Sequence, residues 1–227
     1  PKEFFGDRGC MRIVPGPVIE RQAGHVETVN RRGVQLAREA RDNVAIGEVA
    51  VAGSISALSR REGNAVTPAQ ELASYREVAN ILAEAGCDLI AIEMMTDTTH
   101  APLVMQAAVE IGLPVWLGIS CRRTEAGDLV GLGRSDERLE DILDPLLSMG
   151  PSVVNVMHTN TQTVPDALAI LQERWSGPVG VYPDAGFLAK RHWDFVDVIP
   201  PLTLVSEATA WGRAGVQVFG GCCGTGP

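Results

Sequence analysis

The chain has 227 residues, 45% of them hydrophobic, with a formal net charge of −9 at pH 7 and a pI of about 4.9. This length and composition fit one folded domain, so we expect residues 1–227 to form a single domain. The acidic balance, without a basic stripe, argues against nucleic acid and anionic membranes as partners. The apolar runs are short and interrupted, so the sequence predicts no transmembrane span and no signal peptide.

The cysteine content indicates a chain that stays reduced. An odd number of cysteines without regular spacing argues against a disulfide framework, so we expect a cytoplasmic protein. The sequence leaves the oligomeric state open, and a homo-oligomer remains compatible with it. We interpret three of the five cysteines, Cys10, Cys87 and Cys121, as small buried thiols.

The predicted elements alternate between short β-branched runs and longer helical stretches. The first helix is predicted at 26–42, and the next begins at Pro68 with Thr67 as its N-cap. The segment at 122–135 is predicted to be a polar loop. The strands are predicted at 49–55, 88–94, 114–121, 152–158, 179–182 and 216–219. The helices that follow them are predicted at 69–85, 100–111, 137–149, 165–174 and 204–214.

Strands that are apolar on both faces and separated by helices are typical of a parallel sheet covered by helices. An open doubly wound sheet and a (β/α)8 TIM barrel both fit this pattern. In either fold, functional residues gather at the carboxyl ends of the strands. A barrel needs eight strands, so residues 1–24 would hold remnants of the first two, or those strands lie outside this chain.

Each predicted strand delivers a polar or reactive side chain at its carboxyl end. One such residue means little, but several at one end of a barrel would be brought together. In chain order these residues are Ser54, Glu93, Ser120, Cys121, Asn155, His158, Tyr182, Asp184, Cys222 and Cys223.

The most specific local feature is the segment GGCCGT at 220–225. Adjacent cysteines do not readily form a disulfide with each other, but glycine neighbours allow both thiols to turn toward one ion. Thiolates favour zinc, which takes Cys and His ligands in tetrahedral geometry. The alternative is a tight turn with two incidental thiols. At a barrel strand end, we favour the metal site, with Cys222 and Cys223 as ligands.

Four segments together resemble the homocysteine S-methyltransferase family, which includes betaine-, S-methylmethionine- and folate-dependent enzymes. GGCCGT-x-P matches its C-terminal signature, AGSI at 52–55 is similar to one of its strands, and VYPDAG at 181–186 is similar to its YPN-x-G segment. The stretch at 88–93 resembles a strand whose final glutamate holds the homocysteine amino group. The resemblance extends from about residue 37 to the end, and it implies a (β/α)8 barrel.

Two positions depart from the family pattern. The family supplies a third zinc thiolate from a strand ending G-[IV]-N-C, and Val156 stands where that cysteine is expected. Asp184 replaces the usual asparagine. His158 lies two residues beyond Val156, about 6.6 Å along the same face of a regular strand, and is predicted to be the replacement ligand. Cys121, at another strand end, is the main competitor.

The resemblance implies a zinc-dependent methyltransferase that moves a methyl group to the thiol of homocysteine and so gives methionine. Its partners would be a small-molecule thiol acceptor and a methyl donor whose identity the sequence does not give. A non-catalytic barrel that has lost its third thiolate, and a metal-dependent enzyme acting on a different thiol, are the alternatives. Beside the metal ligands, Glu93 and Asn155 would be catalytic, and the acceptor would contact Glu93, Ser54, Tyr182 and Asp184.

Overall fold

The computed structural model describes residues 17–57, 66–133, 136–184, 187–189, 194–196 and 198–224. Its contacts divide the chain into two compact units. The first unit contains residues 1–92 and 99–116, and the second contains residues 93–98 and 117–227. The predicted Cys10 thiol lies outside the described residues.

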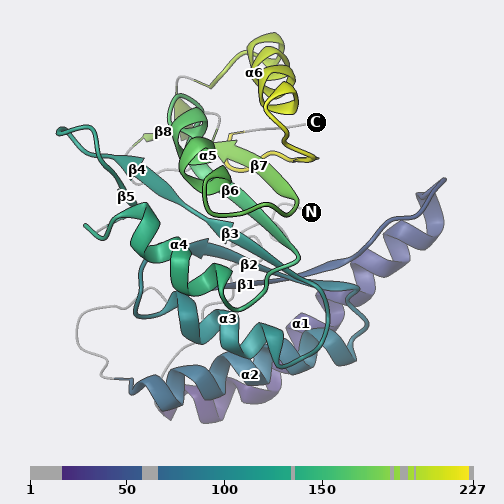
Figure 1. Cartoon of the computed structure of the whole chain (residues 1–227). Coiled ribbons are helices and arrows are strands. Elements are labelled where there is room, and N and C mark those ends of the chain that lie inside the picture. Colours follow the sequence, from purple (N-terminus) through teal and green to yellow (C-terminus); the bar gives the residue numbers. More distant parts are fainter. Residues whose placement is uncertain are drawn as a thin grey trace. The chain divides into compact units, whose positions relative to one another are not determined.

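The first unit is built around helix α2 (Pro68–Glu84), which packs against α1 (Pro17–Val44), α3 (Ala101–Val109) and strand β1 (Ala52–Ser56) (Figure 1). Its contact face is apolar and buried, so burial of these side chains stabilises the unit. The α2 residues concerned are Tyr75, Val78, Ala79, Ile81 and Leu82.

The start of α2 confirms the predicted cap. The Thr67 hydroxyl accepts a hydrogen bond from the Gln70 amide at 3.3 Å, and the Gln70 side chain accepts one from the Thr67 amide at 3.0 Å. This reciprocal pair is a capping box, with Pro68 in the first helical turn.

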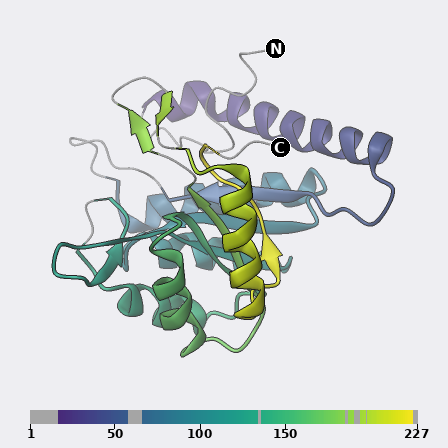
Figure 2. The ribbon, with the colours of Figure 1, turned by 90° about the horizontal axis from the view of Figure 1, so that it is seen from above.

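Helix α1 begins earlier than the sequence predicts. Residues 17–24 are helical, so they contain no remnant of a strand, and residues 1–16 lie outside the described part of the chain. Figure 2 shows α1, in purple, as one continuous helix. From Glu20 onward its sequence is rich in Glu, Arg, Gln and Ala, which favour a helix over a strand.

The second unit contains a parallel arrangement of strands with helices between them. Strand β7 (Val179–Asp184) pairs in parallel with β6 (Val153–Asn160) on one side and with β10 (Val218–Phe219) on the other. The connecting helices are α4 (Leu139–Leu147), α5 (Val164–Gln172) and α6 (Pro201–Arg213). The carboxyl ends of β6, β7 and β10 therefore lie at the same edge of the sheet.

The strand order of the main sheet is β1-β2-β3-β6-β7-β10, where β2 is Leu89–Met95 and β3 is Val115–Ile119. All six of these strands were predicted from the sequence. The alternation of strand and helix confirms the α/β class with a parallel sheet. Among the described residues the main sheet has these six strands, two fewer than a closed eight-stranded barrel.

Two short antiparallel hairpins were not predicted. β4 (Cys121–Arg123) pairs with β5 (Leu129–Gly131) inside the segment expected to be a loop, and β8 (Phe187–Ala189) pairs with β9 (Asp194–Val196). Strands of three residues are too short to show a clear alternation of apolar and polar residues. The first hairpin turns through Gly127, whose φ of 99° suits glycine.

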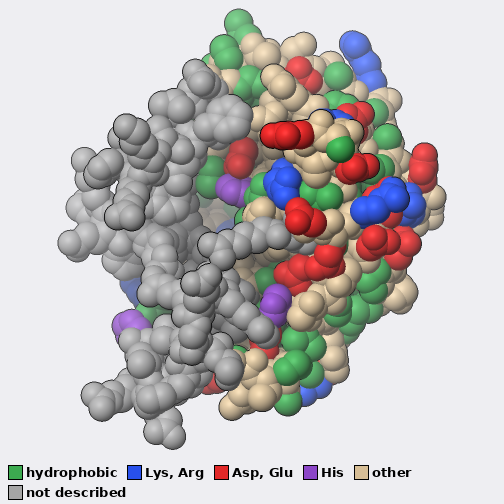
Figure 3. Space-filling model, turned by 90° about the vertical axis from the view of Figure 1, so that its left-hand side faces the viewer, with side chains coloured by type: hydrophobic (Ala, Val, Ile, Leu, Met, Phe, Trp, Pro, Cys, Tyr) green, Lys and Arg blue, Asp and Glu red, His purple; other side chains and the backbone are tan. Residues whose placement is uncertain are grey.

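The described helices include none that is long and apolar enough to cross a membrane. On the face drawn in Figure 3, the described acidic and basic side chains lie near one another, without a continuous basic patch. This distribution agrees with the acidic composition of the chain.

We predict that Gly180→Ala lowers the free energy of unfolding by about 1–3 kcal/mol, because a Cβ there would overlap Asn155 Oδ1 and crowd Val218 at 2.9 Å. Chemical denaturation measures the change. The matched control is Gly33→Ala in α1, where no heavy atom lies within 4 Å of the added Cβ. That variant should gain up to about 1 kcal/mol from helix propensity. Equal effects in the two variants would contradict the close packing assigned to Gly180.

Candidate metal centre

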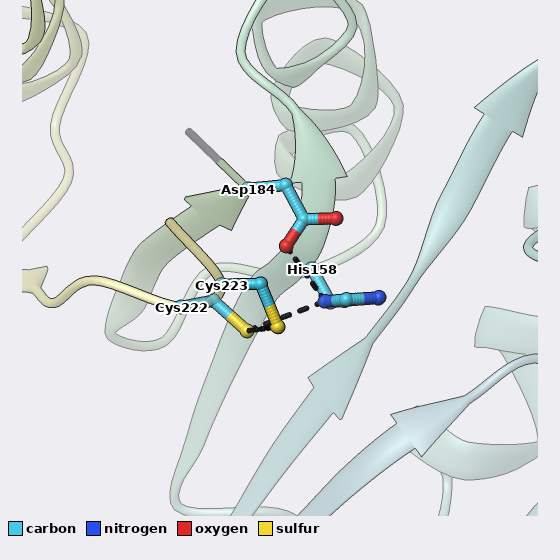
Figure 4. Close-up of side chains that lie close together, drawn as sticks. All are labelled: His158, Asp184, Cys222 and Cys223. Carbon is cyan, nitrogen blue, oxygen red and sulfur yellow. Dashed lines mark hydrogen bonds and ion pairs between the residues drawn. The ribbon is translucent and has the colours of Figure 1, made fainter. Parts of the chain in front are cut away.

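His158 lies where strand β6 loses its regular pairing. The register between β6 and β7 shifts between Met157 and Asn160, and His158 has a φ of 43°. Left-handed backbone is uncommon outside glycine, and histidine is among the residues that adopt it more often. The prediction that His158 lies on the same face as Val156 assumed a regular strand, and the strand is irregular at this point. The turn directs the imidazole toward the end of β7 and toward the cysteine pair (Figure 4).

Asp184 is the last residue of β7, and the two cysteines follow β10. The Cys222 amide donates a hydrogen bond to the Pro183 carbonyl at 3.3 Å, which holds the cysteine segment against the end of β7. Gly224 has a φ of 78°, so the chain turns immediately after Cys223. Figure 4 shows Asp184, His158 and both thiols pointing toward one another.

The four side chains offer donor atoms that all lie within 4.8 Å of one another. His158 Nδ1 lies 2.7 Å from Asp184 Oδ1 and 3.3 Å from Cys222 Sγ, and the two sulfur atoms are 4.0 Å apart. Bond lengths typical of zinc place the donors of a tetrahedral site about 3.3–3.8 Å from one another. Small side-chain movements would therefore let these four atoms surround one ion.

The electrostatics of the cluster favour a bound cation. Burial, reinforced by Cys223 and Asp184, raises the pKa of Cys222 to about 12. A thiolate is unfavourable there unless a positive charge compensates it. In addition, Asp184 Oδ1 is buried, and its contact with His158 Nδ1 at 2.7 Å does not have the geometry of a hydrogen bond. A buried carboxylate oxygen without a well-aligned hydrogen bond fits a metal site, because a cation would compensate its charge.

Glu93 and Tyr182 form a second pair in the same unit. Tyr182 is half-buried and its hydroxyl hydrogen-bonds the half-buried Glu93 carboxylate. Burial, followed by the Glu93 and Cys222 charges, raises the pKa of Tyr182. The phenol thus stays neutral and donates to the carboxylate. The contact joins two residues that the sequence predicted to bind the acceptor. The pair lies close enough to Cys222 for its charge to act on Tyr182.

The backbone beside Glu93 is unusual. Met94 has a φ of 61°, its amide contacts Met157 Sδ at 3.2 Å, and its own sulfur accepts a hydrogen bond from Ser120 at 3.4 Å. A non-glycine residue in this conformation stores strain and is commonest at functional sites.

The other two predicted site residues, Asn155 and Ser54, lie in strands β6 and β1. Asn155 is 1% exposed, pairs with Gly180, and its amide lies 3.5 Å from the Leu117 carbonyl. Gly180 precedes Asp184 by four residues, which corresponds to roughly 13 Å along a strand. Ser54 lies on β1 of the first unit. The catalytic role of Asn155 and the substrate contact of Ser54 stay predictions.

Cys121, the competitor of His158, is buried in another environment. It is 1% exposed, its sulfur lies 3.9 Å from Thr159 Oγ1, and burial raises its pKa to about 11. It is not in the group of four metal donors found among the described residues. The geometry therefore favours His158. Asp184 is the donor that the sequence did not predict as a ligand, although its spacing from Tyr182 placed both on one face of the strand.

We predict that Cys222→Ser and Cys223→Ser each remove most of the metal that the purified protein holds, because each takes away one thiolate donor. Elemental analysis of protein prepared without a chelator measures the change. Cys121→Ser is the matched control and should keep its metal, since Cys121 lies outside the four-donor group. Full retention in both of the other variants would remove the basis for this site.

Comparisons with known proteins identify the family of this chain. The family model described as homocysteine S-methyltransferase matches residues 17–227. Homocysteine S-methyltransferase 1 of Zea mays is 27% identical over 94% of this chain and 73% of its own length. Selenocysteine methyltransferase of Astragalus bisulcatus is 24% identical over 88% of this chain and 68% of its own length.

A solved structure shows the same fold. The apo form of the homocysteine methyltransferase MmuM from Escherichia coli superposes with a TM-score of 0.70 at 21% identity, covering 96% of this chain and 76% of the other. A metallated form of the same E. coli protein superposes with a TM-score of 0.67. The fold expected from the sequence is thereby confirmed. The match of the family model over residues 17–227 shows that this chain belongs to the homocysteine S-methyltransferase family.

Proposed function

We propose that the chain is a zinc-dependent methyltransferase that transfers a methyl group to the thiol of homocysteine, or of a similar small thiol, and so produces methionine or its analogue. The observation that carries the proposal is the convergence of the two thiols of the 220–225 segment and the imidazole of β6 at one edge of the sheet, in a chain that the family model matches over residues 17–227. Its partners are a small-molecule thiol acceptor and a small-molecule methyl donor.

The zinc ligands in this proposal are Cys222, Cys223 and His158, through its Nδ1 atom. Two thiolates and one imidazole suit zinc, and three protein ligands are typical of catalytic zinc sites. When bound, zinc would keep the acceptor's sulfur as a nucleophilic thiolate near neutral pH, where a free thiol with a pKa near about 8.5 is mostly protonated.

The remaining residues position the acceptor. Glu93 contacts its ammonium group, and Tyr182 holds the Glu93 carboxylate in place through their hydrogen bond. Asn155 and Ser54 complete the contacts as the family resemblance implies. Alignment of the acceptor sulfur with the donor's methyl group contributes to the rate, because an in-line displacement depends on the orientation of the reacting atoms.

The proposal extends to the organisation and location of the protein. Residues 1–227 act as one barrel-type domain, since the family model spans both compact units. The protein works in a reducing compartment such as the cytoplasm, because oxidation of Cys222 or Cys223 would remove a zinc ligand.

Two measurements on the purified chain test this function. Zinc content is determined first, and methyl transfer to homocysteine is then assayed with S-methylmethionine, betaine and methylfolate as donors. Near-stoichiometric zinc with transfer from one donor supports the enzyme. A zinc-loaded protein that binds homocysteine but transfers a methyl group from none of them would support the non-catalytic alternative.

We predict that Glu93→Gln weakens homocysteine binding about ten-fold or more while the bound zinc is retained. The loss corresponds to one charge-assisted hydrogen bond of about 1.5–3 kcal/mol. Isothermal titration calorimetry of the zinc-loaded proteins measures it. Glu173→Gln, at a side chain that is 76% exposed, is the control and should bind homocysteine like the parent protein. Unchanged affinity in Glu93→Gln would remove this residue from the acceptor site.

A further inference from the structure

The backbone at Met94 departs from a regular strand directly beside Glu93. Met94 has a φ of 61°, a conformation that non-glycine residues rarely adopt. The burial pattern changes at the same point, because Glu93 and Met94 are both half-buried, whereas Ile92 and Met95 on either side of them are fully buried. The alternation of buried and exposed positions that a half-buried regular strand shows is thus lost at these two residues.

Two sulfur contacts hold Met94 in this conformation. Its amide donates a hydrogen bond to Met157 Sδ at 3.2 Å, and its own Sδ accepts one from the Ser120 hydroxyl at 3.4 Å. Met157 is 3% exposed and Ser120 is fully buried, so both partners of Met94 are shielded from water. A thioether is a weak acceptor, and such a bond needs surroundings that keep the sulfur in place.

Strand pairing keeps the Met157 sulfur in place. Met157 is the register partner of Tyr182 in the parallel pairing of β6 with β7, and side chains of register partners point to the same face of a sheet. Tyr182 hydrogen-bonds the Glu93 carboxylate. The two neighbouring side chains therefore hold one dipeptide, Met157 by the Met94 amide and Tyr182 by the Glu93 carboxylate. Strand β3 lies between β2 and β6 in the sheet, so neither contact belongs to the strand pairing.

We propose that Met157 is a positioning residue for the acceptor: its thioether holds the Met94 amide and so fixes the backbone that directs the Glu93 carboxylate. This inference rests on the proposed function, because it concerns the carboxylate assigned to the acceptor's ammonium group. Met157 was not among the site residues that the strand-end pattern predicted.

The sulfur contact matters because left-handed backbone is unfavourable for methionine. Without the contact, Met94 relaxes toward extended backbone, and the peptide that carries Glu93 turns with it. A charge-assisted hydrogen bond is directional, so a displaced Glu93 carboxylate binds an ammonium group less well. Glycine adopts left-handed backbone without a steric cost, so a glycine at position 94 would not depend on Met157.

Homocysteine binding in a double-mutant cycle separates this role from simple packing. We expect zinc-loaded Met157→Leu to bind homocysteine about three- to ten-fold more weakly with unchanged zinc content, because leucine fills a similar volume and cannot accept a hydrogen bond. Met94→Gly should bind homocysteine like the parent protein. The protein with both substitutions should regain most of the affinity that Met157→Leu loses. Isothermal titration calorimetry measures all four proteins.

Met105→Leu is the matched control, since Met105 is also fully buried and lies in helix α3 of the first unit. It should leave the affinity for homocysteine unchanged. Losses that simply add in the protein with both substitutions would make Met157 a packing residue and overturn the proposal. Unchanged affinity in Met157→Leu would overturn it as well.

Amide hydrogen exchange gives a readout that needs no ligand. In the zinc-loaded proteins without homocysteine, NMR should show the Met94 amide exchanging at least about ten-fold faster in Met157→Leu than in the parent protein, because a hydrogen-bonded amide is protected. Equal rates would show that the sulfur does not hold this amide. A parent protein that binds no homocysteine would contradict the proposed function, and the exchange rates would still decide whether Met157 holds Met94.

Discussion

One constraint dominates the second unit: the donor atoms of four side chains all lie within 4.8 Å of one another. Two are thiols, one is an imidazole, and one is a carboxylate whose buried oxygen lies 2.7 Å from that imidazole without the geometry of a hydrogen bond. Such a set is unfavourable when its acidic members are ionised and nothing positive lies between them. A divalent cation among the donors stabilises the same arrangement. We therefore expect the arrangement of the donors and the binding of the ion to depend on each other.

The parallel sheet explains how distant segments supply these donors. Strands β6, β7 and β10 are neighbours and run in the same direction, so their carboxyl ends meet at one edge. His158 lies near the end of β6, Asp184 ends β7, and the cysteine pair follows β10. Regular strand pairing alone would not bring the His158 imidazole to the other donors. The left-handed backbone at His158 and the register shift beside it redirect the imidazole toward them.

The sequence predicted the parts that rest on strong local patterns. All six strands of the main sheet and the Thr67 cap were found where hydrophobic runs and capping residues indicated them. The cysteine pair and His158 were singled out by residue type at strand ends. The short hairpins carry too few residues for a pattern, and the irregularity of β6 arises from tertiary packing. The sequence predicted Asp184 only as a substrate contact. Its place among the four metal donors depends on the direction of the His158 imidazole, which the sequence pattern does not give.

A crystal structure of the zinc-loaded protein, with anomalous diffraction at the zinc edge, tests the central claim most directly. The account predicts one strong peak among the four donors, about 2.3 Å from both cysteine sulfurs and about 2.0–2.1 Å from His158 Nδ1. A peak bound elsewhere, or no peak with Cys222 and Cys223 apart despite added zinc, would contradict it.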